Sequence, residues 1–216
     1  MTDTNDSSQD DCQDDCQDDW PPLGCPPLAW PDLPDDAARF AWYRAVLAAY
    51  SKLWPDRKKE LPVPEAKLSA LEARLGCSLP PVLRRYHQEL CVTGLAEKLC
   101  EVDGRWARIE SLAEAYPGIV ERASGPEELE EARPLIAFGD YLGNGNMYCF
   151  HRQTGEVYYF DHDSGAMLTR FFDSVTDYLD ALMILTLAEI HDDDQEAGED
   201  LLVQRFGQEL VQKWRY

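Results

Sequence analysis

A chain of 216 residues is long enough for one domain with a sizeable core and extensions, and its formal net charge of −21 argues against phosphate-bearing partners. The charge is uneven, because eleven of the 41 acidic residues and none of the 20 Lys and Arg lie in residues 1–36. The rest of the chain is still acidic, so we expect neither nucleic acid nor a membrane surface as a partner, and favour a basic protein.

The N-terminal segment, residues 1–34, has the composition of an acidic, Pro-rich disordered tail. It repeats QDDC twice between residues 9 and 16, shows no hydrophobic period, and continues into a Pro-rich stretch that cannot form a helix. Cys12 and Cys16 have no His nearby and lack the spacing of a zinc-finger pair, so we predict no metal site there. Order is expected to begin near Asp35.

Cysteine usage and hydropathy indicate the compartment. Seven Cys is an odd number, which does not suit a disulfide framework, and the first nineteen residues contain no apolar stretch typical of a secretory signal. The longest apolar run near the C-terminus, residues 181–185, is far shorter than the roughly 20 residues that a transmembrane helix needs. These features predict a cytoplasmic protein without a membrane segment.

Residues 35–60 are expected to hold an accessory helix. Apolar residues recur at spacings of three and four from Phe40 to Trp54, an Asp at position 35 or 36 can cap the start, and Pro55 ends the pattern. We interpret this helix as packed against the main domain. The alternative is a heptad seam for dimerisation, although the pattern lasts barely two heptads.

The main domain, predicted over residues 61–190, begins with two helices. A Leu stripe follows Pro64 and ends at Gly76, which can adopt the left-handed conformation that closes a helix. A second apolar stripe predicts a helix that starts at Pro81 and ends at Gly94.

Short elements are predicted next. Trp106 and Ile109 suggest a brief strand. Ser111 and Glu114 have the spacing of a capping box, which predicts a helix of one or two turns. Pro126 opens another short, acidic helix.

The most informative stretch is residues 138–164, where two aromatic-rich runs flank a connection that contains Gly155. This pattern is typical of a β-hairpin. Because side chains alternate along a strand, Met147, Cys149 and His151 are expected opposite Tyr148 and Phe150, and Val157 and Tyr159 opposite Tyr158 and Phe160. Both faces are largely apolar, so we expect both to be covered.

The chain after the hairpin should complete the sheet and add helices. A brief strand is expected at Met167–Phe171, and a longer helix begins at Ser174 and ends at the acidic run Asp192–Asp194. Residues 191–216 are predicted to form an acidic linker and one last helix that reaches Trp214.

Four pieces of the sequence in this order, the third made of two strings, resemble the SUKH superfamily, specifically its Smi/Knr branch, over about residues 65–187. They are LEARLGCSLPPVLRRYHQEL (71–90), RIESLAEA (108–115), the hairpin strings LIAFGDYLGNGNMYCFH (135–151) and GEVYYFDHD (155–163), and FFDSVTDYLDAL (171–182). The chain departs from the family at His151, where members often have Asp, and residues 1–60 have no counterpart in the minimal family form.

The resemblance implies a single α+β domain with a mostly antiparallel, twisted sheet flanked by helices. It further implies a protein-binding function, best represented by bacterial immunity proteins that neutralise a cognate polymorphic toxin, often a nuclease. No catalytic residue and no cofactor is implied. The alternative is an intracellular adaptor or regulatory protein of the Smi/Knr type without a toxin partner. An acidic domain suits the first function, because a nuclease toxin must itself attract phosphate.

The third hypothesis is that the protein is an enzyme. Asp161, His162 and Asp163 place carboxylates beside an imidazole, but successive strand residues face opposite ways, so a shared site would need His162 in a turn. The two Asp are better explained as residues that stabilise a turn before Gly165 than as parts of a catalytic or metal site. Gly143–Gly145 is expected to form a tight turn, since no Lys follows it as in a phosphate loop. We therefore predict no catalytic site and no metal site.

The predicted partner-binding surface is the hairpin with its approaches, namely Asp140, Tyr141, Asn144, Tyr158, Asp161 and Asp163. Aromatic side chains supply contact area and carboxylates attract Lys or Arg. The alternative is that Tyr158 belongs to the core and that the Asp residues only serve turns.

Overall fold

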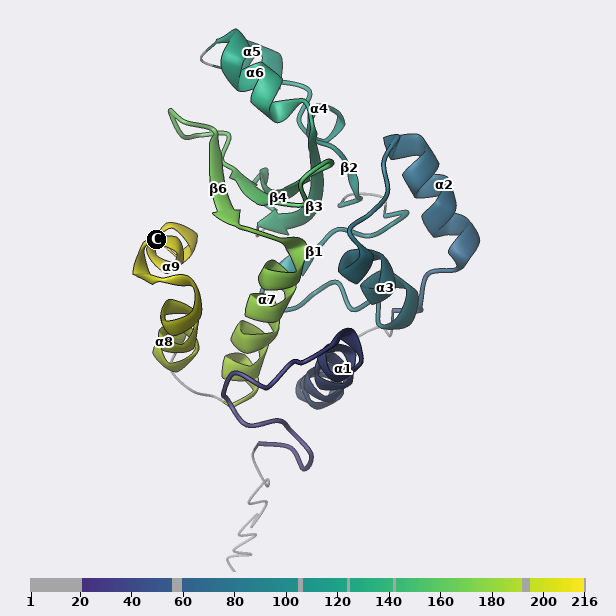
Figure 1. Ribbon diagram of the computed structural model, residues 1–216, viewed down its shortest axis with the longest axis vertical. Helices are drawn as coiled ribbons and strands as arrows, with labels where there is room; N and C mark the ends of the chain where they lie inside the picture. Colours follow the sequence, from purple (N-terminus) through teal and green to yellow (C-terminus); the bar gives the residue numbers. More distant parts are fainter. Residues whose placement is uncertain are drawn as a thin grey trace, which may run out of the picture.

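An antiparallel sheet forms the middle of the structure and carries helices on both faces (Figure 1). The computed structural model describes residues 21–55, 60–104, 107–123, 125–141, 143–191 and 195–215. Its strands are β1 (Lys98–Leu99), β2 (Glu110–Ser111), β3 (Leu135–Tyr141), β4 (Asn146–His151), β5 (Val157–Phe160) and β6 (Leu168–Phe172). They run in the order β1-β3-β4-β5-β6, β2 pairs with a second part of β3, and all these pairs are antiparallel. The expected α+β fold is confirmed.

The helices within the described residues lie on both sides of this sheet. They are α1 (Asp36–Leu53), α2 (Glu65–Leu75), α3 (Pro81–Glu89), α4 (Leu112–Ala115), α5 (Ile119–Arg122), α6 (Pro126–Ala132), α7 (Val175–Ile190), α8 (Gln195–Phe206) and α9 (Gln208–Arg215). Figure 1 shows α4, α5 and α6 together at one end of the molecule, and α7 across the sheet from them. Helix α7 is flanked by α1 and α3 in one direction and by α8 and α9 in the other.

The predicted hairpin is β4 and β5, and its alternation of faces is confirmed. Tyr148, Phe150 and Val157 are fully buried in the main core beside α7. Cys149 and Phe160, on the opposite face, are fully buried in a second, smaller cluster with residues of α4, α5 and α6. Both faces are therefore covered, as the sequence predicted.

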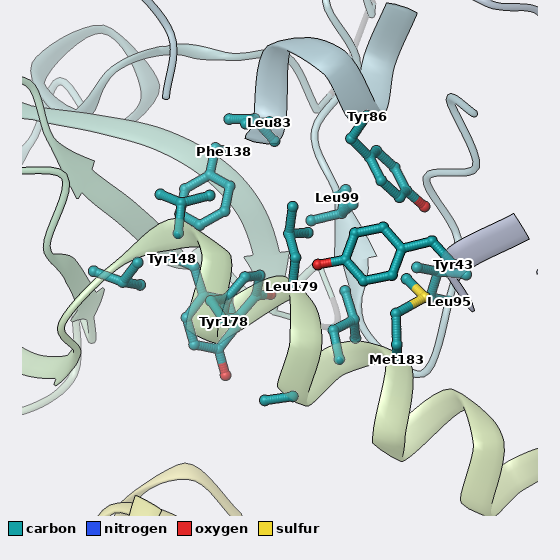
Figure 2. Packing of buried hydrophobic residues seen from close by; sticks show 14 of the residues in the cluster. Tyr43, Leu83, Tyr86, Leu95, Leu99, Phe138, Tyr148, Tyr178, Leu179 and Met183 are labelled. Carbon is teal, nitrogen blue, oxygen red and sulfur yellow. The ribbon is translucent and has the colours of Figure 1, made fainter. Parts of the chain in front are cut away.

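Helix α7 is the centre of the main core. Nearly all its side chains are buried, because the sheet, α1, α3 and α8 surround it. Figure 2 shows Tyr43 of α1 and Tyr86 of α3 beside Leu179 and Met183 of α7. A helix that is apolar all round requires such cover on every side.

A buried carboxylate ties α1 to α7. Asp180 is 6% exposed; the Tyr43 hydroxyl donates to its Oδ1 at 2.6 Å and Arg39 Nε donates at 3.1 Å. Burial raises the pKa of Asp180, and these two donors oppose the rise. The accessory helix predicted in residues 35–60 thus supplies the groups that satisfy a charge on α7.

A second buried carboxylate ties the C-terminal helix to the core. Glu97 is 3% exposed and accepts hydrogen bonds from Tyr178 of α7 at 3.2 Å, Tyr148 of β4 at 3.3 Å and Trp214 of α9 at 2.5 Å. Burial, followed by the charge of Glu97, raises the pKa of Tyr178 well above its ordinary value. Sequence patterns gave no sign of this cluster, since its members are up to 117 residues apart.

Several local signals are confirmed by hydrogen bonds and backbone angles. Gly76 ends α2 with φ 66°, and Gly155 has φ 77° in the β4–β5 connection. Ser111 forms the predicted capping box with Glu114 at the start of α4, and Ser174 caps α7.

Other expectations about element ends were wrong. The predicted last helix is two helices, because Gly207 takes φ 88° between α8 and α9. Helix α3 stops at Glu89 before Gly94 is reached, and Cys91 adopts a left-handed φ of 53°. Trp54, placed on the apolar stripe of α1, is 54% exposed because it lies after the helix end.

The packed part of the chain also starts earlier than Asp35. Residues 21–34 form neither helix nor strand, as expected for a Pro-rich stretch, but they lie against the C-terminal helices. Trp30 Nε1 donates to the Leu201 carbonyl at 2.8 Å, and its ring meets the Phe206 ring edge-on at 5.7 Å. Apolar and aromatic residues interspersed among the prolines make this contact possible.

Predictions about Cys12, Cys16, Trp106 and Asp192–Asp194 concern residues outside the described part of the chain. Cysteines 25, 77, 91, 100 and 149 are free thiols. Among the described residues, none of the helices combines the length and hydrophobicity that crossing a bilayer demands.

Candidate functional site

Two turns meet at one end of the sheet. Since β3, β4, β5 and β6 are consecutive antiparallel neighbours, the β3–β4 and β5–β6 connections lie at the same end, and the β4–β5 turn lies at the other. We call the surface of these two connections the acidic rim. It contains five of the six predicted binding residues, Asp140, Tyr141, Asn144, Asp161 and Asp163.

A histidine joins the two connections of the rim. His162 Nδ1 lies 2.8 Å from Asn146 Oδ1, and the His162 amide donates to the same oxygen at 3.1 Å. Asn146 Nδ2 donates to the Tyr159 hydroxyl at 2.9 Å. A Cβ at Gly145, which has φ 95°, would lie only 3.2 Å from the imidazole. The rim is therefore held in one geometry by hydrogen bonds and a close approach that only glycine permits.

On the β3–β4 side, the predicted residues serve the turn itself. Asp140 Oδ1 accepts from the Gly143 amide at 3.2 Å, and its other oxygen lies 3.7 Å from Lys98 Nζ. Asn144 is exposed, and its Oδ1 accepts from the Asn146 amide at 2.9 Å. Tyr141 is the last residue of β3, opposite Asn146, and its side chain lies outside the described part of the structure.

On the β5–β6 side, one Asp shapes the turn and the other is exposed. Asp161 Oδ1 accepts from the Asp163 amide at 3.0 Å, which is the turn chemistry that the sequence predicted. The Asp163 side chain is 74% exposed, 3.3 Å from His162 Nε2 and 3.9 Å from Arg122 Nη1. Asp163 is thus the rim carboxylate most open to a partner.

Tyr158 does not belong to the rim. It is half-buried on the sheet face that carries the smaller cluster and pairs with Cys149, nearer the β4–β5 turn. Burial raises the pKa of its hydroxyl, and the charges of Glu156 and Glu131 add to the rise. The alternative interpretation, in which Tyr158 packs with neighbouring core residues, describes its position better.

Sequence analysis missed an acidic groove beside the rim. A groove of about 500 Å³ lies between α6 and the β5–β6 turn, and Glu127, Glu128 and Glu131 line it opposite Gly165 and Leu168. Glu128 accepts a hydrogen bond from the Met167 amide, whereas Glu127 and Glu131 are exposed, and the described residues that line the groove include no Lys or Arg. We call it the α6 groove. The acid-dense string PEELEEA was its only signal in the sequence.

The residues considered for chemistry have other roles in the structure. His162 does lie in a turn, but its nitrogens contact Asn146 and Asp163. His151 Nδ1 accepts from two amides of its own turn. Burial raises the pKa of Cys100 to about 12, so its thiol is protonated at neutral pH. Within the described residues, no three His, Cys, Asp or Glu side chains are placed to hold a metal ion.

Comparison with known proteins gave one match. The model of a family described as "SMI1 / KNR4 family (SUKH-1)" matches residues 62–181, which is more than half of the chain. The matched region contains the whole sheet, α2 to α6 and the start of α7; α1, α8 and α9 lie outside it. No curated protein and no solved structure matched the chain.

Proposed function

Since the chain belongs to the SMI1 / KNR4 family (SUKH-1), we propose that it is an immunity protein that binds a basic toxin domain and neutralises it by covering its active surface. It acts as a rigid binding module and performs no catalytic step. The toxin is most simply a nuclease, because a domain that attracts phosphate is complementary to an acidic surface.

The observation that supports this proposal best is the α6 groove beside the acidic rim. Glu127 and Glu131 are exposed carboxylates in a groove whose described lining contains no cationic side chain, and Asp163 stands on the turn that forms its other wall. Two such carboxylates attract Lys or Arg of a cationic partner and repel an anionic one. The hydrogen bonds at His162 hold the rim in place, so little entropy is lost when the partner binds.

Electrostatic attraction would act mainly on the rate of association. Complementary charge raises association rates by about 10–10³-fold at low ionic strength, and salt removes this gain. The expected signature is therefore fast association with a steep salt dependence.

The test is co-expression with the product of the neighbouring gene, followed by association kinetics with the purified pair. Glu127→Lys combined with Glu131→Lys should slow association about tenfold or more at low salt and flatten its salt dependence. The matched control is Glu196→Lys with Asp200→Lys, two exposed acids on α8 with the same change of charge.

Rescue of toxin-expressing cells by the unaltered chain and by the α8 control, but poorly by the α6 variant, is the expected result. Absence of any rescue would reject the immunity function in favour of a regulatory protein without a toxin partner. Equal association rates for both double variants would show that the α6 groove is not part of the binding surface.

A further inference from the structure

A second groove lies beyond the opposite edge of the sheet, beside β1. Its volume is about 580 Å³, and it separates the segment that leads into α2 from the residues on either side of β1. Its floor includes Val63, Cys91 and Val102, each less than 9% exposed. Leu61 lines the same groove and is 79% exposed, so an apolar side chain stands uncovered at its entrance. We call it the β1 groove.

Hydrogen bonds fix the two walls of the β1 groove relative to each other. Glu60 accepts from the Thr93 hydroxyl at 2.9 Å and from the Thr93 amide, and so bridges the walls at one end. The Val63 amide donates to the His87 carbonyl of α3 at 2.9 Å, which anchors the α2 side. The groove is therefore a built feature of the fold, and an occupant would enter a preformed site.

The described residues that line the β1 groove include more carboxylates than amines. Glu60, Glu101 and Asp103 supply the carboxylates, and Lys67 supplies the one amine within this described lining. Lys67 pairs with Asp103, whereas Glu101 is exposed and its carboxylate has no partner among the described residues. Burial raises the pKa of Cys91 on the groove floor to about 11, and the charges of the three carboxylates add to the rise.

We propose that the β1 groove is a docking site for an extended segment of another protein that carries Lys or Arg next to an aliphatic residue. The aliphatic side chain would cover Val63 and Val102 and meet Leu61, and the cation would pair with Glu101. Burying the exposed apolar surface of Leu61 favours binding, and the carboxylates select against anionic segments. Extended peptides commonly bind in such grooves through alternate side chains.

This proposal is independent of the toxin-binding proposal. The β1 groove adjoins β1, whereas the α6 groove adjoins the β5–β6 turn, and the sheet order places these at opposite edges. A second partner, or a second segment of the same partner, can therefore bind while the α6 groove is occupied.

The test uses the ¹⁵N-labelled full chain and the blocked hexapeptide GKLKLG, followed by NMR titration. Saturable shifts are expected for amides of Leu61, Val102 and their neighbours. Blocked GELELG and GKSKSG are the control peptides, since one reverses the charge and the other removes the aliphatic residues. Both should bind about fivefold more weakly or worse.

Glu101→Lys should weaken GKLKLG binding about fivefold, whereas Glu196→Lys, the same change of charge on α8, should leave it within about twofold. Both positions are exposed, and an unchanged spectrum away from the substitution will show that the variant is folded. The proposal is overturned if the peptide gives no saturable shift, if shifts gather at the α6 groove, or if Glu101→Lys binds as tightly as the unaltered chain.

Discussion

Replacing His87 by Leu should remove a large part of the acid sensitivity of this protein. His87 is fully buried in α3, and neither of its ring nitrogens has a hydrogen-bond partner among the described residues. Burial lowers its pKa from 6.5 to about 4. The folded protein therefore holds a neutral imidazole in an environment that cannot solvate an imidazolium ion.

The sign and size of the effect follow from this shift. In the unfolded chain His87 takes up a proton near pH 6.5, and in the folded chain only near pH 4. Between these values the unfolded state binds more protons, so the free energy of unfolding falls as the pH falls. Each pKa unit corresponds to about 1.4 kcal/mol, so protonation of His87 lowers the free energy of unfolding by about 3 kcal/mol in total. This loss is complete once the pH is below the pKa of His87 in the folded protein.

His87→Leu should also change stability at neutral pH. The imidazole contributes two desolvated nitrogens without partners, and Leu has a similar volume without polar atoms. We expect the variant to gain about 1 kcal/mol in the free energy of unfolding at about pH 7.

The assay is urea unfolding followed by circular dichroism at several pH values between about 7 and about 4. Carboxylates titrate in both proteins, so the difference between the two stability curves isolates His87. The expected difference widens steadily in favour of Leu as the pH falls. Parallel curves, or a Leu variant that is less stable throughout, would refute the reasoning.

Two further predictions concern single side chains in the core. Trp214→Phe should lower the free energy of unfolding, measured in urea, by about 2 kcal/mol, because the lost N–H donates to the charged Glu97. The matched change Trp30→Phe should lower it by about 1 kcal/mol, because that N–H donates to the neutral Leu201 carbonyl. Equal losses would show that the acceptor's charge contributes nothing. Cys91→Gly should be more stable than Cys91→Ala by about 1 kcal/mol in thermal and urea unfolding, because residue 91 has φ 53°; the opposite order would show that this backbone is unstrained.

Local patterns predicted the elements whose causes are local. The capping box at Ser111 and the left-handed Gly76 depend on residues three or four positions away, and both were found as expected. The two faces of the hairpin follow from strand alternation, and the buried Tyr148 and Phe160 confirm it on opposite sides. The break at Gly207 was missed because an isolated Gly within an apolar helical period is compatible with a continuous helix.

The candidate site was only partly predictable for a related reason. Asp161 and Asp163 were found in a turn because turn chemistry is local. Glu131 was missed because α6 meets the β5–β6 turn only through tertiary packing, which no sequence period records. Tyr158 was assigned to the partner-binding surface because the sequence pattern of an aromatic strand residue is the same whether a helix or a partner covers its face.

The elements outside the matched family region have a physical role that explains their presence. Asp180 and Glu97 are buried carboxylates within residues 62–181, and each needs donors to offset the cost of its burial. Asp180 accepts hydrogen bonds from Arg39 and Tyr43 of α1, and Glu97 accepts one from Trp214 of α9. Helices α1 and α9 are thus part of the same folding unit as the family region, although they lie outside the matched residues. They pack on the α7 side of the sheet, so this elaboration stabilises the core and leaves the acidic rim and the α6 groove open to a partner.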